Sequence, residues 1–403
     1  MIERELYLKQ LETFKDKNII KVITGIRRCG KSSLLKTFAD RLRKAGVKDS
    51  HIIEINLEDL KYDGLDYKSL NDMIVKQLSK NTNDKTYIFL DEIQRVESWE
   101  KVANSLYLNK NADLYLTGSN AYMLSSELST YLSGRFVEIK MLPLSFKEFL
   151  DFYTFELSVT KEEKFNQYLK FGGMPSIAEY NFDELAVSKT LDGIYNTVLM
   201  KDVVARDVVK DITSLQKLVK YLADNVGNIT SINSITNILY SEKSISSKNN
   251  KMIEEYIHYL ENAFIFYKVN RYDIKGKDLL KSLEKYYIVD MGLRQYLLGK
   301  ITDKGRILEN IVYFELLRRG YKVSIGKIGD KEVDFVATKT DQKIYIQVTE
   351  SLANEATRER ELSSLDAIKD SFEKIVLTAD VLFTGVTDKG YKVLNIIDWL
   401  LEE

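Results

Sequence analysis

A phosphate-binding loop is the strongest chemical signal in the sequence. Residues 25–32 read GIRRCGKS and fit the pattern GxxxxGK[ST], between an apolar β-branched run and a helical run. In such a loop backbone N–H groups surround the β-phosphate of a nucleotide, Lys31 reaches the β- and γ-phosphates, and Ser32 offers a hydroxyl to Mg²⁺. The sequence therefore predicts ATP and Mg²⁺ as cofactors, with the nucleotide held by Gly25, Ile26, Arg27, Arg28, Cys29, Gly30, Lys31, Ser32 and Ser33.

An acidic pair follows a second apolar run. Residues 87–92 read YIFLDE, so four apolar residues precede Asp91 and Glu92. In a site that hydrolyses a nucleotide, Asp91 would hold Mg²⁺ and Glu92 would polarise the attacking water. Acidic residues after a strand also cap helices, and the phosphate loop is what favours the catalytic interpretation.

A third polar group is expected at the end of a neighbouring strand. The apolar run at 113–117 leads into Gly118, Ser119 and Asn120. A polar side chain there could reach the γ-phosphate or the water, and we favour Asn120 over Thr117 and Ser119. The alternative is that Asn120 caps the next helix.

Arg135, in the segment LSGRF at 132–136, precedes the last strand of this region. An arginine there could point at the nucleotide of another subunit, a contribution worth orders of magnitude in rate. The alternative is a surface salt bridge, worth ~0–1 kcal/mol. We therefore expect catalytic roles for Glu92, Asn120 and Arg135, metal ligation by Ser32 and Asp91, and self-association through Arg135.

The elements that position these groups alternate along the chain. Strand patterns occur at 18–25, 51–57, 87–90, 113–117 and 136–141, with helix-length segments between them. This alternation predicts an α/β P-loop fold, a parallel sheet wrapped by helices, over residues 1–144.

Three more segments follow this fold. Residues 145–211 read as helices interrupted at 171–175 (FGGMP), and we expect a helical lid. Residues 212–300 give three helices and a two-stranded ribbon, which is typical of a winged helix. Residues 301–403 alternate helices and strands and predict a second α/β domain.

The composition limits the functional classes. The 403 residues are 44% hydrophobic and 30% charged, as in globular proteins, and 59 Lys and Arg oppose 60 Asp and Glu, so any basic surface must be local. One cysteine and two histidines exclude a disulfide framework and a Cys/His zinc site. The Cys29 thiol is either activated by the helix N-terminus or buried and inert. A charged start and short apolar runs predict a cytoplasmic protein without membrane contact.

The chain resembles a known family along its whole length. GIRRCGKSSLL, FLDEIQ followed by Trp99, LTGSN, SGRF, LPLSFKEF and GGMP are similar in order and spacing to AAA+-like ATPases of bacteria and archaea that carry a C-terminal domain of unknown function. The similarity continues through KDVVARD, KYYIVDMGLR, GRILENIVYFEL, EVDFV and IQVTE. The resemblance implies an ATP-binding core with a sensor at Asn120 and an arginine finger at Arg135. A winged helix and a restriction-endonuclease-like domain would follow.

The expected winged helix has a mild excess of positive charge. Residues 213–300 hold 13 Lys and Arg against 9 Asp and Glu. The run SSKNNK at 246–251 opens the third helix, and the ribbon carries Lys268, Arg271, Lys275 and Lys277. These groups suit DNA phosphates, and packing against a protein is the alternative.

Glu309, Asp334 and Gln347 are spaced like the centre of a PD-(D/E)xK nuclease, where two carboxylates hold Mg²⁺ and a lysine assists cleavage. Gln347 replaces the second carboxylate and Thr349 replaces the lysine, although Lys327 or Lys331 could supply the missing cation. We expect a degenerate site used for binding or packing. The run TRERE at 357–361 is expected to be a solvated face.

These patterns predict an Mg²⁺-dependent ATPase whose hydrolysis rearranges the lid, the winged helix and the nuclease-like domain, coupled to DNA binding. One alternative is a slow nucleotide-gated switch that acts on a protein partner. Another is an ATP-driven nuclease.

Overall fold

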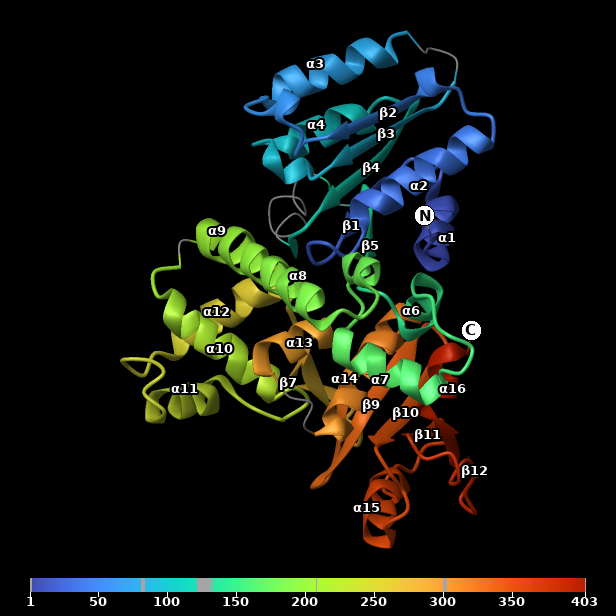
Figure 1. The fold of residues 1–403 in the computed structure, drawn as a ribbon, viewed down its shortest axis with the longest axis vertical. Coiled ribbons are helices and arrows are strands. Elements are labelled where there is room, and N and C mark those ends of the chain that lie inside the picture. Colours follow the sequence, from blue (N-terminus) through green and yellow to red (C-terminus); the bar gives the residue numbers. More distant parts are fainter. Residues whose placement is uncertain are drawn as a thin grey trace. The chain divides into compact units, whose positions relative to one another are not determined.

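The computed structural model describes residues 2–80, 84–121, 132, 134–207, 209–299 and 303–402. The chain forms two compact units (Figure 1), which we describe separately. The first comprises Met1–Pro143 with Asn262–Phe264, and the second comprises Leu144–Glu261 with Ile265–Glu403. In the described ranges, no helix is both long and apolar enough to span a bilayer.

The first unit is a parallel sheet wrapped by helices, as the sequence predicts. Its order along the chain is α1 (Glu5–Phe14), β1 (Ile20–Thr24), α2 (Lys31–Lys44), β2 (Ile52–Asn56), α3 (Tyr67–Leu78), β3 (Thr86–Asp91), α4 (Trp99–Tyr107), β4 (Ala112–Gly118) and β5 (Phe136–Lys140). The strand order is β2-β3-β4-β1-β5, and every pairing is parallel. The carboxyl ends of β1, β3 and β4 therefore meet at one edge, where ligands of such sheets bind.

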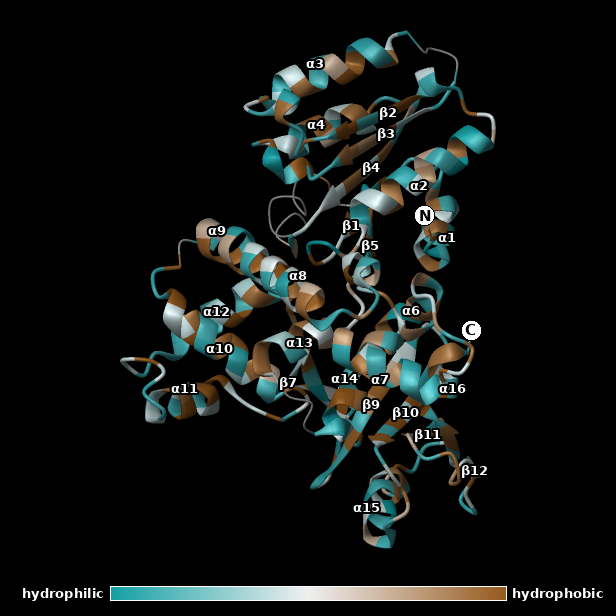
Figure 2. Ribbon diagram, viewed as in Figure 1, coloured by the Kyte–Doolittle hydropathy of each residue, from teal (hydrophilic) through white to brown (hydrophobic). Residues whose placement is uncertain are grey.

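Both faces of this sheet are covered, which explains its nearly continuous apolar strands. Ile88 and Leu114 pack with α3 and α4 in one core cluster. On the other face, Phe38 of α2 contacts the rings of Phe89 and Tyr115. Figure 2 accordingly shows brown strands between helices of mixed hydropathy.

The helical part of the second unit runs from α6 to α13. Its elements are α6 (Phe146–Phe152), α7 (Lys161–Phe171), a 3₁₀ segment (Pro175–Tyr180), α8 (Glu184–Thr197), a π-helical segment (Val198–Val204), α9 (Ala205–Asp207), α10 (Ile212–Asp224), α11 (Ile232–Ser241), α12 (Asn250–Asn262) and α13 (Met291–Leu298). The predicted interruption at 171–175 is confirmed, because α7 ends at Phe171 and the next segment begins at Pro175.

A mixed sheet completes the second unit. Its elements are β6 (Phe266–Asp273), β7 (Asp278–Ile288), α14 (Lys304–Arg318), β8 (Lys322–Ile328), β9 (Lys331–Lys339), β10 (Gln342–Thr349), α15 (Glu355–Asp366), β11 (Glu373–Thr378), β12 (Gly385–Val386), β13 (Lys392–Asn395) and α16 (Ile396–Leu401). The strand order is β12-β13-β11-β10-β9-β8-β6-β7. The expected ribbon, β6 and β7, is thus hydrogen-bonded to β8 as part of this sheet. The division of this unit into lid, winged helix and terminal domain stays a proposal.

The glycines of the FGGMP segment interlock with the start of α13. A Cβ on Gly172 would lie 2.4 Å from the backbone nitrogen of Gly292, and a Cβ on Gly292 would lie 2.1 Å from the Phe171 carbonyl oxygen. Asp290 caps α13 and accepts hydrogen bonds from the backbone N–H groups of Gly173 (2.6 Å) and Leu293 (3.0 Å). Glycine is required at 172 and 292 because any side chain would collide with backbone.

Asp290 should make stability fall as pH rises from about 4 to about 6. Burial raises the pKa of Asp290 from its ordinary value of 3.8 to about 6, against the lowering effect of the three N–H groups and Arg318. In this interval the folded state binds a proton that the unfolded state has released, so the stabilisation present below the unfolded pKa is lost, by roughly 3 kcal/mol. Asp290→Asn should lack this dependence.

Thermal unfolding at pH 4.5, 6 and 7 measures the effect. The melting temperature of Asp290→Asn relative to that of the wild type should increase with pH up to about 6 and stay constant above it. If the melting temperatures of the wild type and Asp290→Asn changed with pH by the same amount, the raised pKa of Asp290 would not be the cause.

Candidate nucleotide-binding site

The phosphate loop connects β1 to α2 through three residues with positive φ. These are Gly25 (143°), Arg28 (69°) and Gly30 (106°), and Gly30 is the N-cap of α2. A Cβ on Gly25 would lie 2.1 Å from the Met141 carbonyl oxygen, so only glycine fits there. Arg28 holds a left-handed conformation without being glycine, and strain of this kind is concentrated at functional sites.

Lys31 is folded back onto its own loop. Its side chain is buried, and its Nζ donates hydrogen bonds to the carbonyl oxygens of Gly25 (2.9 Å) and Ile26 (3.1 Å). Ser32 and Ser33 are exposed in the first turn of α2. The helix N-terminus and its hydroxyls are therefore open to a phosphate, and Lys31 must leave the two carbonyls to reach it.

Thr117 joins the acidic pair to the sheet beside the loop. Its Oγ1 donates to Oδ1 of Asp91 and accepts a hydrogen bond of 2.9 Å from the backbone N–H of Glu92. In the β1–β4 ladder Thr117 pairs with Ile23, two residues before Gly25. Both acids are 7% exposed, and Glu92 has a φ of 53°. The structure thus places Asp91 and Glu92 at the sheet edge from which the phosphate loop starts.

The carboxylate of Glu92 has two side-chain partners. Its Oε2 accepts hydrogen bonds from Ser119 Oγ (3.3 Å) and from Gln94 Nε2. Thr117 and Ser119, which sequence reasoning ranked below Asn120, thus contact the acids directly. Asn120 is buried at the same end of β4, and its role toward phosphate stays a prediction. Contacts between strands distinguish these residues, and such contacts have no signal in a single sequence.

Arg135 lies at the opposite edge of the sheet. It immediately precedes β5, which pairs in parallel with β1, so at ~3.3 Å per residue about 16 Å separate it from the loop. Its guanidinium donates to Oδ1 of Asn104 and lies 5.4 Å from the ring centroid of Tyr107, both on α4. Within one subunit Arg135 is therefore a packing residue, and any contact with a nucleotide requires a second subunit.

Two other loop residues, Arg27 and Cys29, have structural partners. Arg27 forms an ion pair with Glu58, beyond the end of β2. Cys29 is fully buried, as in the inert-thiol alternative, and its Sγ lies 3.5 Å from the Met141 carbonyl oxygen. Arg4, which sequence reasoning missed, donates to the Cys29 carbonyl oxygen at 3.1 Å.

The donor set suits Mg²⁺ held jointly with a nucleotide. Ser32 supplies a hydroxyl and Asp91 a carboxylate, and Mg²⁺ typically takes one or two carboxylates together with substrate phosphates. Across the described residues, no cluster of three or more His, Cys, Asp or Glu side chains is arranged to bind a metal. The nucleotide phosphates would therefore have to complete the ligand shell.

Comparisons with known proteins agree with the fold of the first unit. A family model described as an AAA domain matches residues 17–150, and one described as a domain of unknown function matches residues 162–304. An uncharacterized protein of Haemophilus influenzae is 42% identical over 100% of this chain and 99% of its own length. One of Methanocaldococcus jannaschii is 34% identical over 92% of this chain and 82% of its own length. The chain belongs to this family of AAA-domain proteins.

A solved structure shows the same fold. The Walker-type ATPase of Pyrococcus abyssi superimposes with a TM-score of 0.52 at 16% identity, over 74% of this chain and 96% of its own. The expected AAA+-like, P-loop ATPase fold is thus confirmed. The winged-helix and restriction-endonuclease-like assignments stay predictions.

The second unit of this AAA-domain protein contains a buried charge cluster around Lys285. The Lys285 ammonium lies 2.7 Å from carboxylate oxygens of both Glu309 and Glu332. Tyr287 donates a hydrogen bond to Glu309. Burial lowers the pKa of Lys285, but the surrounding carboxylates outweigh burial and raise it. Lys285 is therefore a permanent cation between the carboxylates.

The other expected nuclease-like residues adjoin this cluster. Gln347 accepts from the backbone N–H of Asp334 (2.7 Å) and donates to Glu361 (2.6 Å). Burial, and then the nearby Glu309 carboxylate, raise the pKa of Asp334 well above its usual range. The expectation that 357–361 is a solvated face is wrong at Glu361, which is buried.

This arrangement does not fit a divalent metal. A lysine ammonium already neutralises Glu309, and Gln347 is engaged by Asp334 and Glu361. Lys331, one of the two lysines expected to supply a cation, donates instead to the Ser363 carbonyl oxygen (3.0 Å). The cation comes from β7, in the ribbon assigned to another segment.

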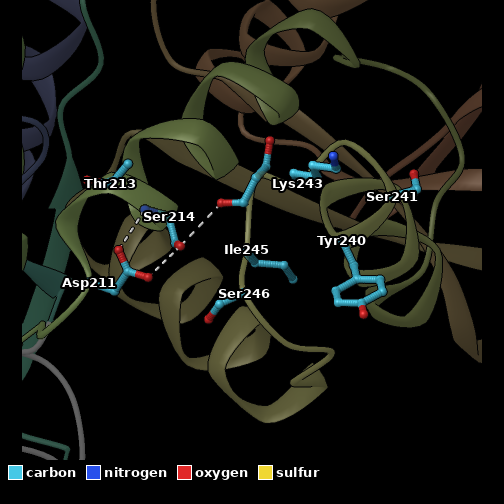
Figure 3. A pocket seen from close by; sticks show the side chains of 9 residues that line it. Asp211, Thr213, Ser214, Tyr240, Ser241, Lys243, Ile245 and Ser246 are labelled. Carbon is cyan, nitrogen blue, oxygen red and sulfur yellow. Dashed lines mark hydrogen bonds between the residues drawn. The ribbon is translucent and has the colours of Figure 1, made fainter.

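A pocket of about 630 Å³ lies between the start of α10, the end of α11 and the loop before α12 (Figure 3). Ser214 donates to Asp211 through its backbone N–H (3.0 Å) and its hydroxyl (2.6 Å). Most of the lining side chains carry hydroxyls, namely Thr213, Ser214, Tyr240, Ser241, Ser244 and Ser246. Lys243 adds a cation. The pocket is thus rich in hydroxyl groups and lies within the segment, 212–300, where a winged helix was expected.

Proposed function

We propose that this protein binds ATP with Mg²⁺ and hydrolyses it, and that the cycle rearranges the second unit. Lys31 holds the phosphates and Ser32 and Asp91 hold the metal. Glu92 orients the attacking water, and Asn120 contacts the γ-phosphate. Bound Mg²⁺ supplies charge neutralisation at the phosphates, whereas the protein groups position phosphate and water.

The observation that carries the proposal is the position of Thr117. This one residue touches both acids and pairs with β1 just before the phosphate loop. A metal-side carboxylate and a water-orienting carboxylate therefore lie at the carboxyl edge of the sheet together with a phosphate-binding helix N-terminus. That combination supports hydrolysis over binding alone.

The first experiment is ATP turnover by the purified protein, with and without double-stranded DNA, at two salt concentrations. Lys31→Ala is the blank. Salt-sensitive stimulation by DNA would support coupling to a phosphate backbone. A very low rate that DNA does not change would favour the alternative, a nucleotide-gated switch acting on a protein partner. No ATP hydrolysis above that of Lys31→Ala, together with no ATP binding, would contradict both the ATPase and the switch.

Thr117→Val should slow turnover without weakening ATP binding. Valine keeps the shape but removes the hydroxyl that positions Asp91 and Glu92, and misplaced catalytic groups cost about 10- to 100-fold. Steady-state rates and binding calorimetry separate the two effects. Thr86→Val is the matched control, because Thr86 is buried at the other end of β3 and its hydroxyl has no hydrogen-bond partner. Equal rates for both variants would remove Thr117 from the site.

We propose that Arg135 acts across a subunit interface. Arg135→Ala subunits keep complete nucleotide sites, whereas Lys31→Ala subunits keep the arginine. Each variant alone should be inactive in ATP hydrolysis. Mixing them should restore part of the ATPase activity, because some interfaces then place the Arg135 of one subunit beside the intact nucleotide site of the other. If the two variants form mixed oligomers and the mixture still hydrolyses ATP no faster than either variant alone, Arg135 does not act across a subunit interface.

DNA is the partner that the chemistry of α10–α12 suits. Lys243 lines the hydroxyl-rich pocket, and the Lys248 ammonium lies 5.4 Å from the ring centroid of Tyr240. A double Lys243→Ala/Lys248→Ala variant should lose DNA stimulation and reduce the salt dependence of binding. The alternative hypothesis of an ATP-driven nuclease requires that the protein nicks DNA with Mg²⁺ and that Asp334→Ala abolishes the nicking. The ion pair of Lys285 with Glu309 argues against this hypothesis.

A further inference from the structure

Arg4 ties the phosphate loop to the chain segment that leaves the first unit. Its side chain is 5% exposed. The guanidinium donates to three backbone carbonyl oxygens: Cys29 of the loop (3.1 Å), Leu142 (2.8 Å) and Pro143 (3.2 Å). Because the guanidinium is planar and rigid, donating to three acceptors at once fixes their relative positions more firmly than three separate donors would.

Further contacts join the same two segments. The backbone N–H of Met141 donates to the Thr24 carbonyl oxygen (2.7 Å), immediately before the loop. The Met141 carbonyl oxygen faces Gly25 so closely that a Cβ would lie 2.1 Å from it, and Cys29 Sγ contacts the same oxygen. The hydroxyl of Tyr7 accepts from the backbone N–H of Leu142 (3.0 Å). Residues 141–143 are therefore attached to both ends of the loop.

The loop must change when phosphate binds. Lys31 now occupies the carbonyl oxygens of Gly25 and Ile26, and it has to release them to reach a phosphate. The backbone N–H of Cys29 donates to the Ile26 carbonyl oxygen (3.3 Å), and loop N–H groups must turn toward the ligand. Movement of the Cys29 peptide displaces a carbonyl that Arg4 holds together with those of Leu142 and Pro143.

We propose that Arg4 is a positioning residue that couples the nucleotide state of the phosphate loop to residues 141–143, and through them to the chain that enters the second unit at Leu144. The proposal rests on ATP binding at the loop. It gives Arg4, the residue that precedes α1, a role in the cycle rather than in folding alone.

Hydrogen exchange with and without ATP tests the coupling, in a Glu92→Gln background that prevents turnover. In that background ATP should change the exchange of amides at 141–146. With Arg4→Met added, ATP should bind within a few-fold of the parent affinity, but the change at 141–146 should disappear. In an otherwise wild-type chain, Arg4→Met should lower turnover by about 10- to 100-fold. Arg4→Lys, which keeps the charge but not the fork, should be intermediate.

Arg41→Met is the matched control, because Arg41 also contacts the N-terminal region, through Glu3 and Glu5, but not the loop. It should keep the full response. The proposal would be overturned if ATP still changed the hydrogen exchange of residues 141–146 in Arg4→Met. It would also be overturned if Arg4→Met lowered ATP affinity and melting temperature as well as turnover, because the residue would then act only through stability. If Arg4→Met does not fold, the response of Arg4→Lys decides in the same way. Failure of the wild type to bind ATP in calorimetry would instead refute the proposed function.

Discussion

Glu92→Gln is expected to bind ATP as the wild type does and to hydrolyse it about 10²–10⁴-fold more slowly. Ser119 and Gln94 hold the Glu92 carboxylate beside the phosphate loop. Glutamine preserves the size of the side chain and an oxygen acceptor but cannot take a proton from water. Binding calorimetry and single-turnover rates at pH 7 measure the two quantities separately.

Three further variants serve as controls for this experiment. Lys31→Ala should lose ATP binding, since it removes the ammonium that is proposed to hold the β- and γ-phosphates. Lys36→Ala, on the exposed face of α2, should bind ATP normally. Glu97→Gln, an exposed neighbour of the acidic pair, should turn over at the wild-type rate. Normal hydrolysis by Glu92→Gln would remove Glu92 from the water-orienting role.

Lys285→Met is expected to lower the free energy of unfolding of the second unit by about 3–5 kcal/mol. Lys285 is 2% exposed and neutralises Glu309 and Glu332, which lie 2.7 Å from its ammonium. Methionine fills most of the volume but leaves the carboxylates without a counter-ion in a buried site. Urea unfolding at pH 7, followed by tyrosine fluorescence and circular dichroism, measures the loss.

The source of this loss can be identified with a second substitution. Adding Glu309→Gln to Lys285→Met removes one uncompensated carboxylate and should recover at least about 1 kcal/mol. Lys331→Met, on β9, should stay within about 0.5 kcal/mol of the wild type because Lys331 is exposed. A wild-type stability for Lys285→Met would show that the cluster does not depend on its cation.

The phosphate loop and the acidic pair could be predicted because their chemistry is local. In GIRRCGKS the residues that shape the loop and those proposed to bind phosphate are neighbours in sequence, and a short apolar run identifies the strand before Asp91. The same locality allowed the strand expected at 136–141 to be found at Phe136–Lys140. The two-residue β12 has no such local signal, because a strand so short has no periodicity.

The contacts of Thr117 and Lys285 could not be predicted because they arise between elements that are distant in sequence. Thr117 meets Asp91 across the β3–β4 pairing, 26 residues away in sequence. Lys285 meets Glu309 of α14, 24 residues away, and its strand β7 joins the mixed sheet through β6, whereas the sequence analysis assigned the ribbon to a separate winged helix. Sequence spacing predicted that Glu309, Asp334 and Gln347 lie close together, but it did not identify Lys285 as the cation beside them.

Arg4 was missed for a different reason. The first residues read as a charged start, and the charges obscured the helical spacing of Tyr7, Leu8 and Leu11, all of which are buried in α1. Attention to that spacing would have indicated a packed helix. It would not have indicated that the arginine before the helix reaches the phosphate loop.

The interlock of Gly172, Asp290 and Gly292 also has a consequence for synthesis on the ribosome. The hydrogen bond from Gly173 to Asp290 spans 117 residues. At 5–20 residues per second, roughly 6 to 23 s pass between the emergence of its two partners. During that interval α7, whose Tyr168 packs against Phe146 and Phe149 of α6, lacks the segment that interlocks with its C-terminal end. We expect the nascent chain to bind chaperones during this interval, although every strand of the first sheet has already been synthesised.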